Sequence, residues 1–147
     1  MVDFGQWKYT VDREATVRAY AAAERGWVDR CDCVQCRNFR IARSSAFPAA
    51  FLALLEQLGI DPAKDAEVYY IGRQAPGRYR YGGWFHFIGT LEETGDFPMV
   101  ELEPGFSAFL CRAAFPRLPS LKEKPAVQLE FLADAVPWLL DGPEPAW

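Results

Sequence analysis

The hydrophobic and polar positions of this chain follow two periods, and the change between them comes near residue 60. Between residues 13 and 58, apolar residues recur every three or four positions, which is the spacing of an amphipathic helix. From residue 67 onward they alternate with polar residues, as in a strand with one buried face. A short alternating run at 7–11 predicts one strand before the helices.

The first two predicted helices flank a cluster of cysteines. Asp12 has the side chain of a helix N-cap and predicts a helix over 13–25, which Gly26 ends. After the cysteines, residues 38–43 can form about two helical turns with Phe39 facing inward. Both helices are expected to bury one side.

The third predicted helix has the clearest signals at both ends. Pro48 suits the first helical position, and Gly59 suits a left-handed C-cap. Between them lies one apolar stripe, formed by Phe51, Leu54, Leu55 and Leu58.

The second half of the chain predicts a series of strands. They are expected at 67–71, 79–91, 100–103, 106–112 and 127–131. Gly82 and Gly83 interrupt the longest of them and indicate a bulge or a close approach of another group. Helices followed by strands favour an α+β fold, with helices in the N-terminal half packed on a mostly antiparallel sheet from the C-terminal half.

Composition supports one globular domain spanning residues 1–147. The net charge is −4, with +2 in residues 1–43 and −6 in residues 44–147, which argues against a general nucleic-acid binder. No apolar run reaches the roughly 18 residues of a membrane span, and no signal-peptide pattern opens the chain. We therefore expect a cytoplasmic protein whose thiols stay reduced.

The residues with the most distinctive chemistry are Cys31, Cys33 and Cys36. The two-residue spacing of Cys33 and Cys36 lets a tight turn direct both sulfurs at one tetrahedral ion, and Cys31 projects to the same side in an extended segment. The hypothesis that follows is a structural zinc site. Because Zn²⁺ takes four ligands there, the fourth is expected from His86, the only histidine, or from Cys111, the remaining cysteine.

Other interpretations of the same cysteines stay open. Arg30 and Arg37 flank the cluster and would favour thiolates, either for a metal such as Zn²⁺ or Cu(I) or for redox chemistry. Cys33 and Cys36 also have the spacing of a thiol redox pair. Unliganded thiols packed as small hydrophobic groups are the third interpretation.

Catalytic signatures are weak in this sequence. A single histidine gives little support to a Ser-His-Asp triad or a histidine-rich hydrolase site, and no phosphate-binding loop is present. The dense aromatic residues at 69–87 are compatible with a core, and an exposed share of them would suit a protein partner. A protein-interaction module of the immunity or inhibitor type is therefore the alternative to metal binding.

Several short motifs occur together: C-x-C-x-x-C-x-N-F, a leucine-rich helix ending in L-G-I-D-P-A-K, E-V-Y, Y-G-G-W-F-H-F and V-Q-L-E-F. They lie at 31–39, 47–64, 67–69, 81–87 and 127–138, where the last stretch also ends in V-P-W. With this combination the chain resembles a family of small uncharacterised bacterial proteins with the C-x-C-x-x-C-x-N-F signature. The resemblance implies a bacterial, cytoplasmic, single-domain protein, and it implies no activity or ligand.

Overall fold

The structure is a computed structural model that describes residues 1–92 and 95–146. Its helices are α1 (Arg13–Ala22), α2 (Val34–Ala46) and α3 (Ala49–Leu58). Its strands are β1 (Val2–Phe4), β2 (Trp7–Val11), β3 (Glu67–Ala75), β4 (Arg78–Leu91), β5 (Val100–Glu103), β6 (Phe106–Arg112) and β7 (Ala126–Pro137), with a short 3₁₀ helix, η1 (Pro119–Leu121), before β7. No helix within these ranges is long and apolar enough to cross a membrane.

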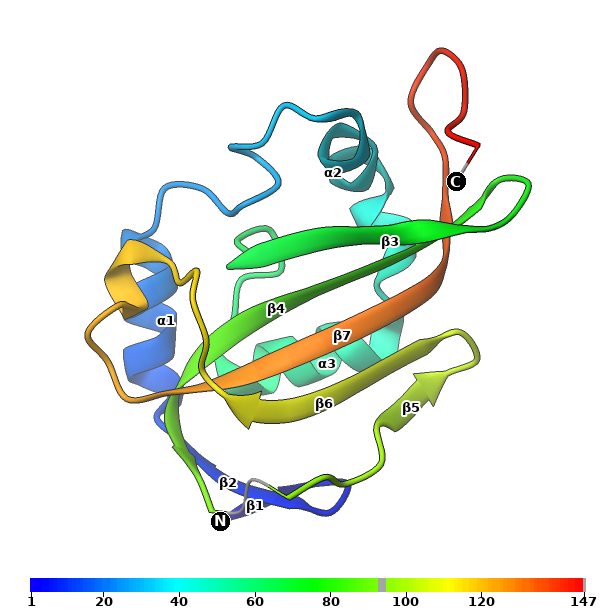
Figure 1. The fold of residues 1–147 in the computed structure, drawn as a ribbon. Helices are drawn as coiled ribbons and strands as arrows, with labels where there is room; N and C mark the ends of the chain where they lie inside the picture. Colours follow the sequence, from blue (N-terminus) through cyan, green and yellow to red (C-terminus); the bar gives the residue numbers. More distant parts are fainter. Residues whose placement is uncertain (93–94, 147) are drawn as a thin grey trace.

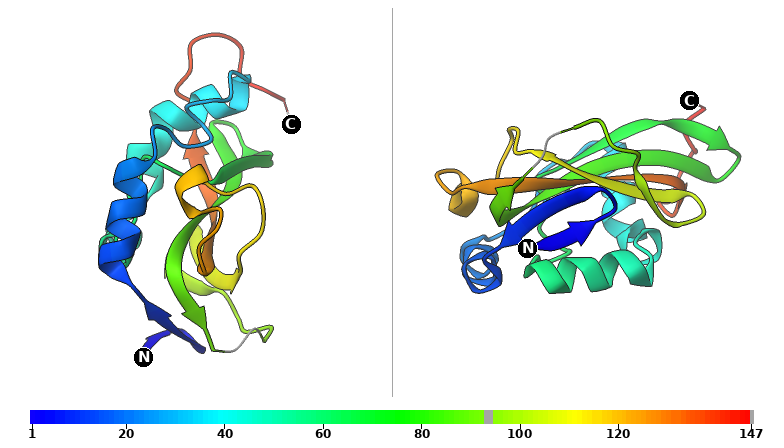
Figure 2. Two further views of the ribbon diagram at one scale, coloured as in Figure 1. Left: turned by 90° about the vertical axis from the view of Figure 1, so that its left-hand side faces the viewer. Right: turned by 90° about the horizontal axis from the view of Figure 1, so that it is seen from below.

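The strands form one sheet in the order β1-β2-β4-β7-β6-β5. Strand β3 lies off this path and pairs with residues 78–84 of β4, whereas β2 pairs with residues 89–91. The pairings between neighbouring strands are antiparallel. All three helices lie against one face of this sheet (Figures 1 and 2). The predicted α+β class is confirmed, with the helices in the N-terminal half and most of the sheet in the C-terminal half.

Helix α1 confirms the predicted start but not the predicted end. The Asp12 side chain accepts a hydrogen bond from the Ala15 N–H at 3.0 Å, as expected of an N-cap. The helix ends at Ala22, well before Gly26. A Cβ atom on Gly26 would lie 2.6 Å from the backbone nitrogen of Asp65, so this glycine permits two loops to touch rather than ending a helix.

Helices α2 and α3 differ in how well the sequence predicted them. Helix α2 is longer than the predicted 38–43 segment because it begins directly after Cys33, which acts as its N-cap. The Cys33 sulfur accepts a hydrogen bond from the Cys36 N–H at 3.4 Å, although cysteine is not among the usual capping residues. Helix α3 ends before Gly59 as predicted, and Gly59 has a left-handed φ of 81°. It begins one residue later than predicted, because Pro48 is extended and is the N-cap instead of the first helical residue.

Aromatic rings fill the space between the helices and the sheet. Phe131 of β7 lies at the centre of this layer and is fully buried. Its ring centroid lies between 5.1 and 6.2 Å from those of Phe39, Phe47, Phe51, Phe85 and Phe106. Such offset and edge-to-face pairs add to the free energy gained by burying the rings. This layer fixes α2 and α3 on the sheet.

The long strand β4 has one face against the helical layer and one face on the other side of the sheet. Tyr81 and Phe85 are buried in the core and contact Phe39 and Phe47 of the helical layer. The register to β7 is continuous across the two glycines, so Trp84 points to the opposite face. There its Nε1–H donates to a carbonyl in the loop before η1.

Replacing Phe131 with Ala should lower the free energy of unfolding by about 3–5 kcal/mol, because it removes the central ring of the core and leaves a cavity. Urea unfolding followed by circular dichroism measures this loss. Phe115→Ala is the matched control: Phe115 is 65% exposed, and its loss should cost less than about 0.5 kcal/mol. Equal losses in both variants would contradict this description of the core.

Candidate metal centre

The irregular segment 23–33, which carries two of the cysteines, is held in place by one buried carboxylate. The backbone N–H of Trp27 donates to the carbonyl of Asp65 at 3.0 Å, and the N–H of Val28 donates to its carboxylate at 3.2 Å. Arg43 of α2 lies 3.5 Å from the same carboxylate. Burial raises the pKa of Asp65 to about 6, against the lowering effect of these hydrogen bonds and of Arg43. The segment is thereby tied to the turn before β3.

Arg40 of α2 positions the backbone next to the cysteines. Its Nη2 donates to the carbonyl of Val28 at 2.7 Å and to the carbonyl of Cys31 at 3.1 Å. Its Nε lies 3.5 Å from the Asp29 carboxylate. A guanidinium group presents several donors in a rigid fork, which suits this bridging of two carbonyls. Sequence reasoning missed Arg40, because nothing in its spacing indicates a contact across the helix start.

Two further residues of the cysteine motif connect it to the rest of the fold. Asn38 is fully buried, and its Nδ2 donates to the carbonyl of Pro137 at 3.0 Å. Its Oδ1 accepts from the N–H of Leu139 at 2.7 Å. Phe39 packs in the aromatic core. Both residues of this N-F pair therefore anchor α2, whose N-cap and first turn carry two of the sulfurs.

The structure brings Cys31, Cys33 and Cys36 together. The sulfurs of Cys31 and Cys33 are 3.3 Å apart, and all three sulfurs lie within 4.8 Å of one another. Three thiolates around a tetrahedral Zn²⁺ would be separated by about 3.8 Å, because the Zn–S distance is about 2.3 Å. The arrangement is therefore compatible with a metal-binding site.

The three thiols differ in exposure and in acidity. Cys33 is exposed, Cys31 is half-buried, and Cys36 is 6% exposed. The pKa of Cys31 is lowered, chiefly by a hydrogen bond from the Cys33 N–H and then by the neighbouring thiols. Burial raises the pKa of Cys36, and the two adjacent sulfurs raise it further. The main cause of the acidic thiol is thus a backbone hydrogen bond, not the flanking arginines that the sequence indicated.

The structure does not bring either predicted fourth ligand into this group. In the part of the chain that the structure describes, the metal-compatible group consists of the three cysteines, without His86 or Cys111. The His86 ring is fully buried on β4, with its Nε2 3.0 Å from Gln128 Oε1 of β7. Cys111 lies on β6, opposite Gln128 in register. Sequence reasoning missed Gln128, whose role depends on strand pairing.

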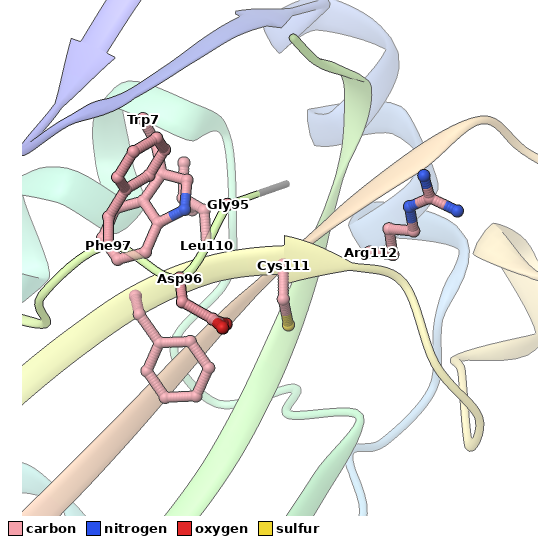
Figure 3. Close-up of a pocket in the computed structure, with 8 residues that line it drawn as sticks. Trp7, Gly95, Asp96, Phe97, Leu110, Cys111 and Arg112 are labelled. Atoms are coloured by element: carbon pink, nitrogen blue, oxygen red, sulfur yellow. The ribbon is translucent and has the colours of Figure 1, made fainter. Parts of the chain in front are cut away.

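Cys111 instead belongs to the wall of a pocket on the far side of the molecule from α2. The pocket has a volume of about 330 Å³ and includes Asp96 and Arg112 (Figure 3). Burial and then the charge of Glu130 raise the pKa of Cys111 to about 11. This thiol is therefore protonated at neutral pH and is a poor candidate for a reactive group.

Comparisons of the chain with protein-family models, with curated proteins and with solved structures gave no match. The predicted family resemblance is therefore untested and stays a prediction. Function has to be inferred from the geometry of the site itself.

Acid should destabilise the fold through His86. Burial lowers its pKa from 6.5 to about 4, although Gln128 partly offsets this shift. Between these values the unfolded chain takes up a proton that the folded protein does not, so the free energy of unfolding falls as the pH drops below 6.5. The contribution of this residue should decrease by about 3 kcal/mol between pH 7.5 and pH 4.

Urea unfolding of the wild type and of His86→Gln across this pH range isolates the effect, because the variant keeps every other titrating group. The difference in stability between the two proteins should shrink steadily towards acid pH. A difference that does not depend on pH would show that His86 titrates alike in both states.

Proposed function

We propose that Cys31, Cys33 and Cys36 bind one thiophilic metal ion, with Zn²⁺ the favoured candidate, in a structural and non-enzymatic role. The observation that carries the proposal is the convergence of the three sulfurs at the start of α2, within 4.8 Å of one another. Thiolates of this kind select zinc and other soft ions over magnesium or calcium.

The local backbone supports thiolate ligation. The N–H of Cys36 donates to the Cys33 sulfur, and a hydrogen bond from the Cys33 N–H lowers the pKa of Cys31, which favours the thiolate form of Cys31. Three thiolates and Zn²⁺ carry a net charge of −1. Arg37, exposed in the first turn of α2, is a nearby positive charge that would offset it.

A structural role follows from where the ligands lie. Cys31 belongs to the irregular segment before α2, whereas Cys36 belongs to the helix itself. A shared ion would therefore clamp the segment to the helix and add to the hydrogen bonds of Arg40. The described residues supply three ligands to the group. The fourth coordination position of the ion would therefore be taken by water or by a donor outside the three cysteines.

Thiol redox chemistry is the second candidate, and one observation favours it. Cys33 is exposed at a helix N-terminus and Cys36 is buried three residues further on, which is the arrangement of an attacking and a resolving thiol. In either case we place the protein in the cytoplasm of a bacterium. That compartment is reducing, so the cysteines would not form stable disulfides and could keep a bound metal.

Protein purified without an affinity tag or chelator should contain about one zinc ion per chain by elemental analysis. Cys33→Ser should lose most of it, because two sulfurs cannot hold the ion. Cys111→Ser is the matched control and should keep the full content, because this thiol lies outside the group. Chelation should lower the melting temperature of the wild type and leave that of Cys33→Ser unchanged.

Zinc content that is unaffected by Cys33→Ser would contradict the proposed site. A metal-free protein in which one thiol of the cluster reacts with a disulfide reagent much faster than Cys111 would favour the redox alternative. If the purified protein contains no metal and all its thiols react slowly and alike with the disulfide reagent, both the metal site and the redox function would be excluded.

A further inference from the structure

The face of the sheet opposite the helices carries a second chemical feature, unrelated to the cysteines. Helices α1, α2 and α3 lie on one face, and the segment 113–121 crosses the other face at one end (Figures 1 and 2). That segment is fastened by the Ala114 N–H, which donates to Gln128 Oε1 at 2.8 Å, and by the carbonyl of Pro116, which accepts from Trp84 Nε1 at 3.2 Å.

Beside this segment lies a surface that we call the open-face patch. Strand register places its residues in adjacent positions, since Glu67 of β3 is opposite Trp84 of β4, which is opposite Glu130 of β7 and then Phe109 of β6. The patch consists of Glu67, Tyr69, Trp84, Phe109, Phe115 and Glu130.

The aromatic part of the patch is fixed in position. The Tyr69 ring lies over Gly82, where any side chain would collide with it, and its centroid is 6.1 Å from that of Trp84. This contact explains why the strand carries a glycine there. Phe115 precedes the Pro116 whose carbonyl Trp84 contacts; it is 65% exposed, and the guanidinium group of Arg117 lies 5.0 Å from its ring centroid. Rigid aromatic rings that are partly exposed are the usual anchors of protein interfaces.

The acidic part of the patch is held in place but lacks an ionic partner. Glu130 accepts hydrogen bonds from the Tyr69 hydroxyl at 2.7 Å and from Gln128 Nε2 at 2.9 Å. Desolvation and then the nearby charge of Glu130 raise the pKa of Glu67. Within residues 1–92 and 95–146, neither carboxylate forms a salt bridge with a basic side chain.

Another carboxylate on the same face of the sheet does have an ionic partner. Asp134, further along β7, pairs with Arg80 of β4 at 2.7 Å. The position between Glu67 and Glu130 instead holds the neutral indole of Trp84. An aromatic face between two carboxylates attracts a guanidinium group, through the ring quadrupole and through paired hydrogen bonds.

We propose that the open-face patch docks an arginine-bearing segment of a partner protein, with one guanidinium group stacked on Trp84 between Glu67 and Glu130. The patch extends over four neighbouring strands, a width of roughly 14 Å, which suits a chain segment better than a small amine. Because the patch is acidic, we expect the partner's contacting surface to be basic. The proposal does not depend on the metal site.

The test is a titration of the ¹⁵N-labelled protein with a hexa-arginine peptide at low ionic strength, followed by NMR. The indole N–H signal of Trp84 and the amide signals of Tyr69 and Glu130 should shift together. Glu67→Gln and Glu130→Gln should each weaken binding about tenfold. The glutamine at position 130 keeps an oxygen for the Tyr69 hydroxyl but loses the acceptor for Gln128 Nε2, so a modest fall in its melting temperature is expected. Glu67→Gln leaves both of these hydrogen bonds in place and should melt like the wild type, so its affinity tests the proposal independently of any change in folding.

Glu56→Gln is the matched control, because it removes the same charge from an exposed position of α3 on the helical side. Its affinity for the peptide should equal that of the wild type. If all three variants weakened peptide binding equally, the binding would come from the overall negative charge of the protein, and the proposal would be overturned. Shifts outside the patch would also overturn it, as would an equal affinity for N-acetylarginine amide, which would indicate a small cationic ligand instead of a protein segment.

Discussion

The packing of aromatic rings around Phe131 is the constraint on which the rest of the structure depends. Phe39 of α2 and Phe51 of α3 contact this ring directly, so both helices have one defined position on the sheet. Because Cys33 and Cys36 lie at the start of α2, the same packing sets the positions of two sulfurs. The third, in Cys31, is placed by polar contacts instead, which makes the site a product of core packing and buried hydrogen bonds together.

Local signals in the sequence predicted most of the fold. The change of hydrophobic period separated helices from strands, and the cap at Asp12 was correct. The prediction failed where distant residues decide the local structure. Gly26 resembles a helix end, but its role depends on the backbone of Asp65, far away in the sequence. The start of α2 was missed because Cys33 caps it through sulfur.

The candidate site was predictable only in its local part. The spacing of three cysteines within six residues indicated that their sulfurs could converge, and the structure brings the sulfurs within 4.8 Å of one another. The fourth ligand could not be chosen in this way, because His86 and Cys111 are placed by strand pairing on a different part of the molecule. The sheet also separates two kinds of chemistry, with the cysteines beside the helical layer and the paired carboxylates of the open-face patch on the opposite face.

The most direct test of the central claim is X-ray absorption at the zinc edge of the purified protein. A zinc ion bound by Cys31, Cys33 and Cys36 predicts three sulfur neighbours at about 2.3 Å and one lighter donor at about 2.0 Å. A first shell made of oxygen and nitrogen alone would contradict the account, because it would place the bound ion away from the three cysteines.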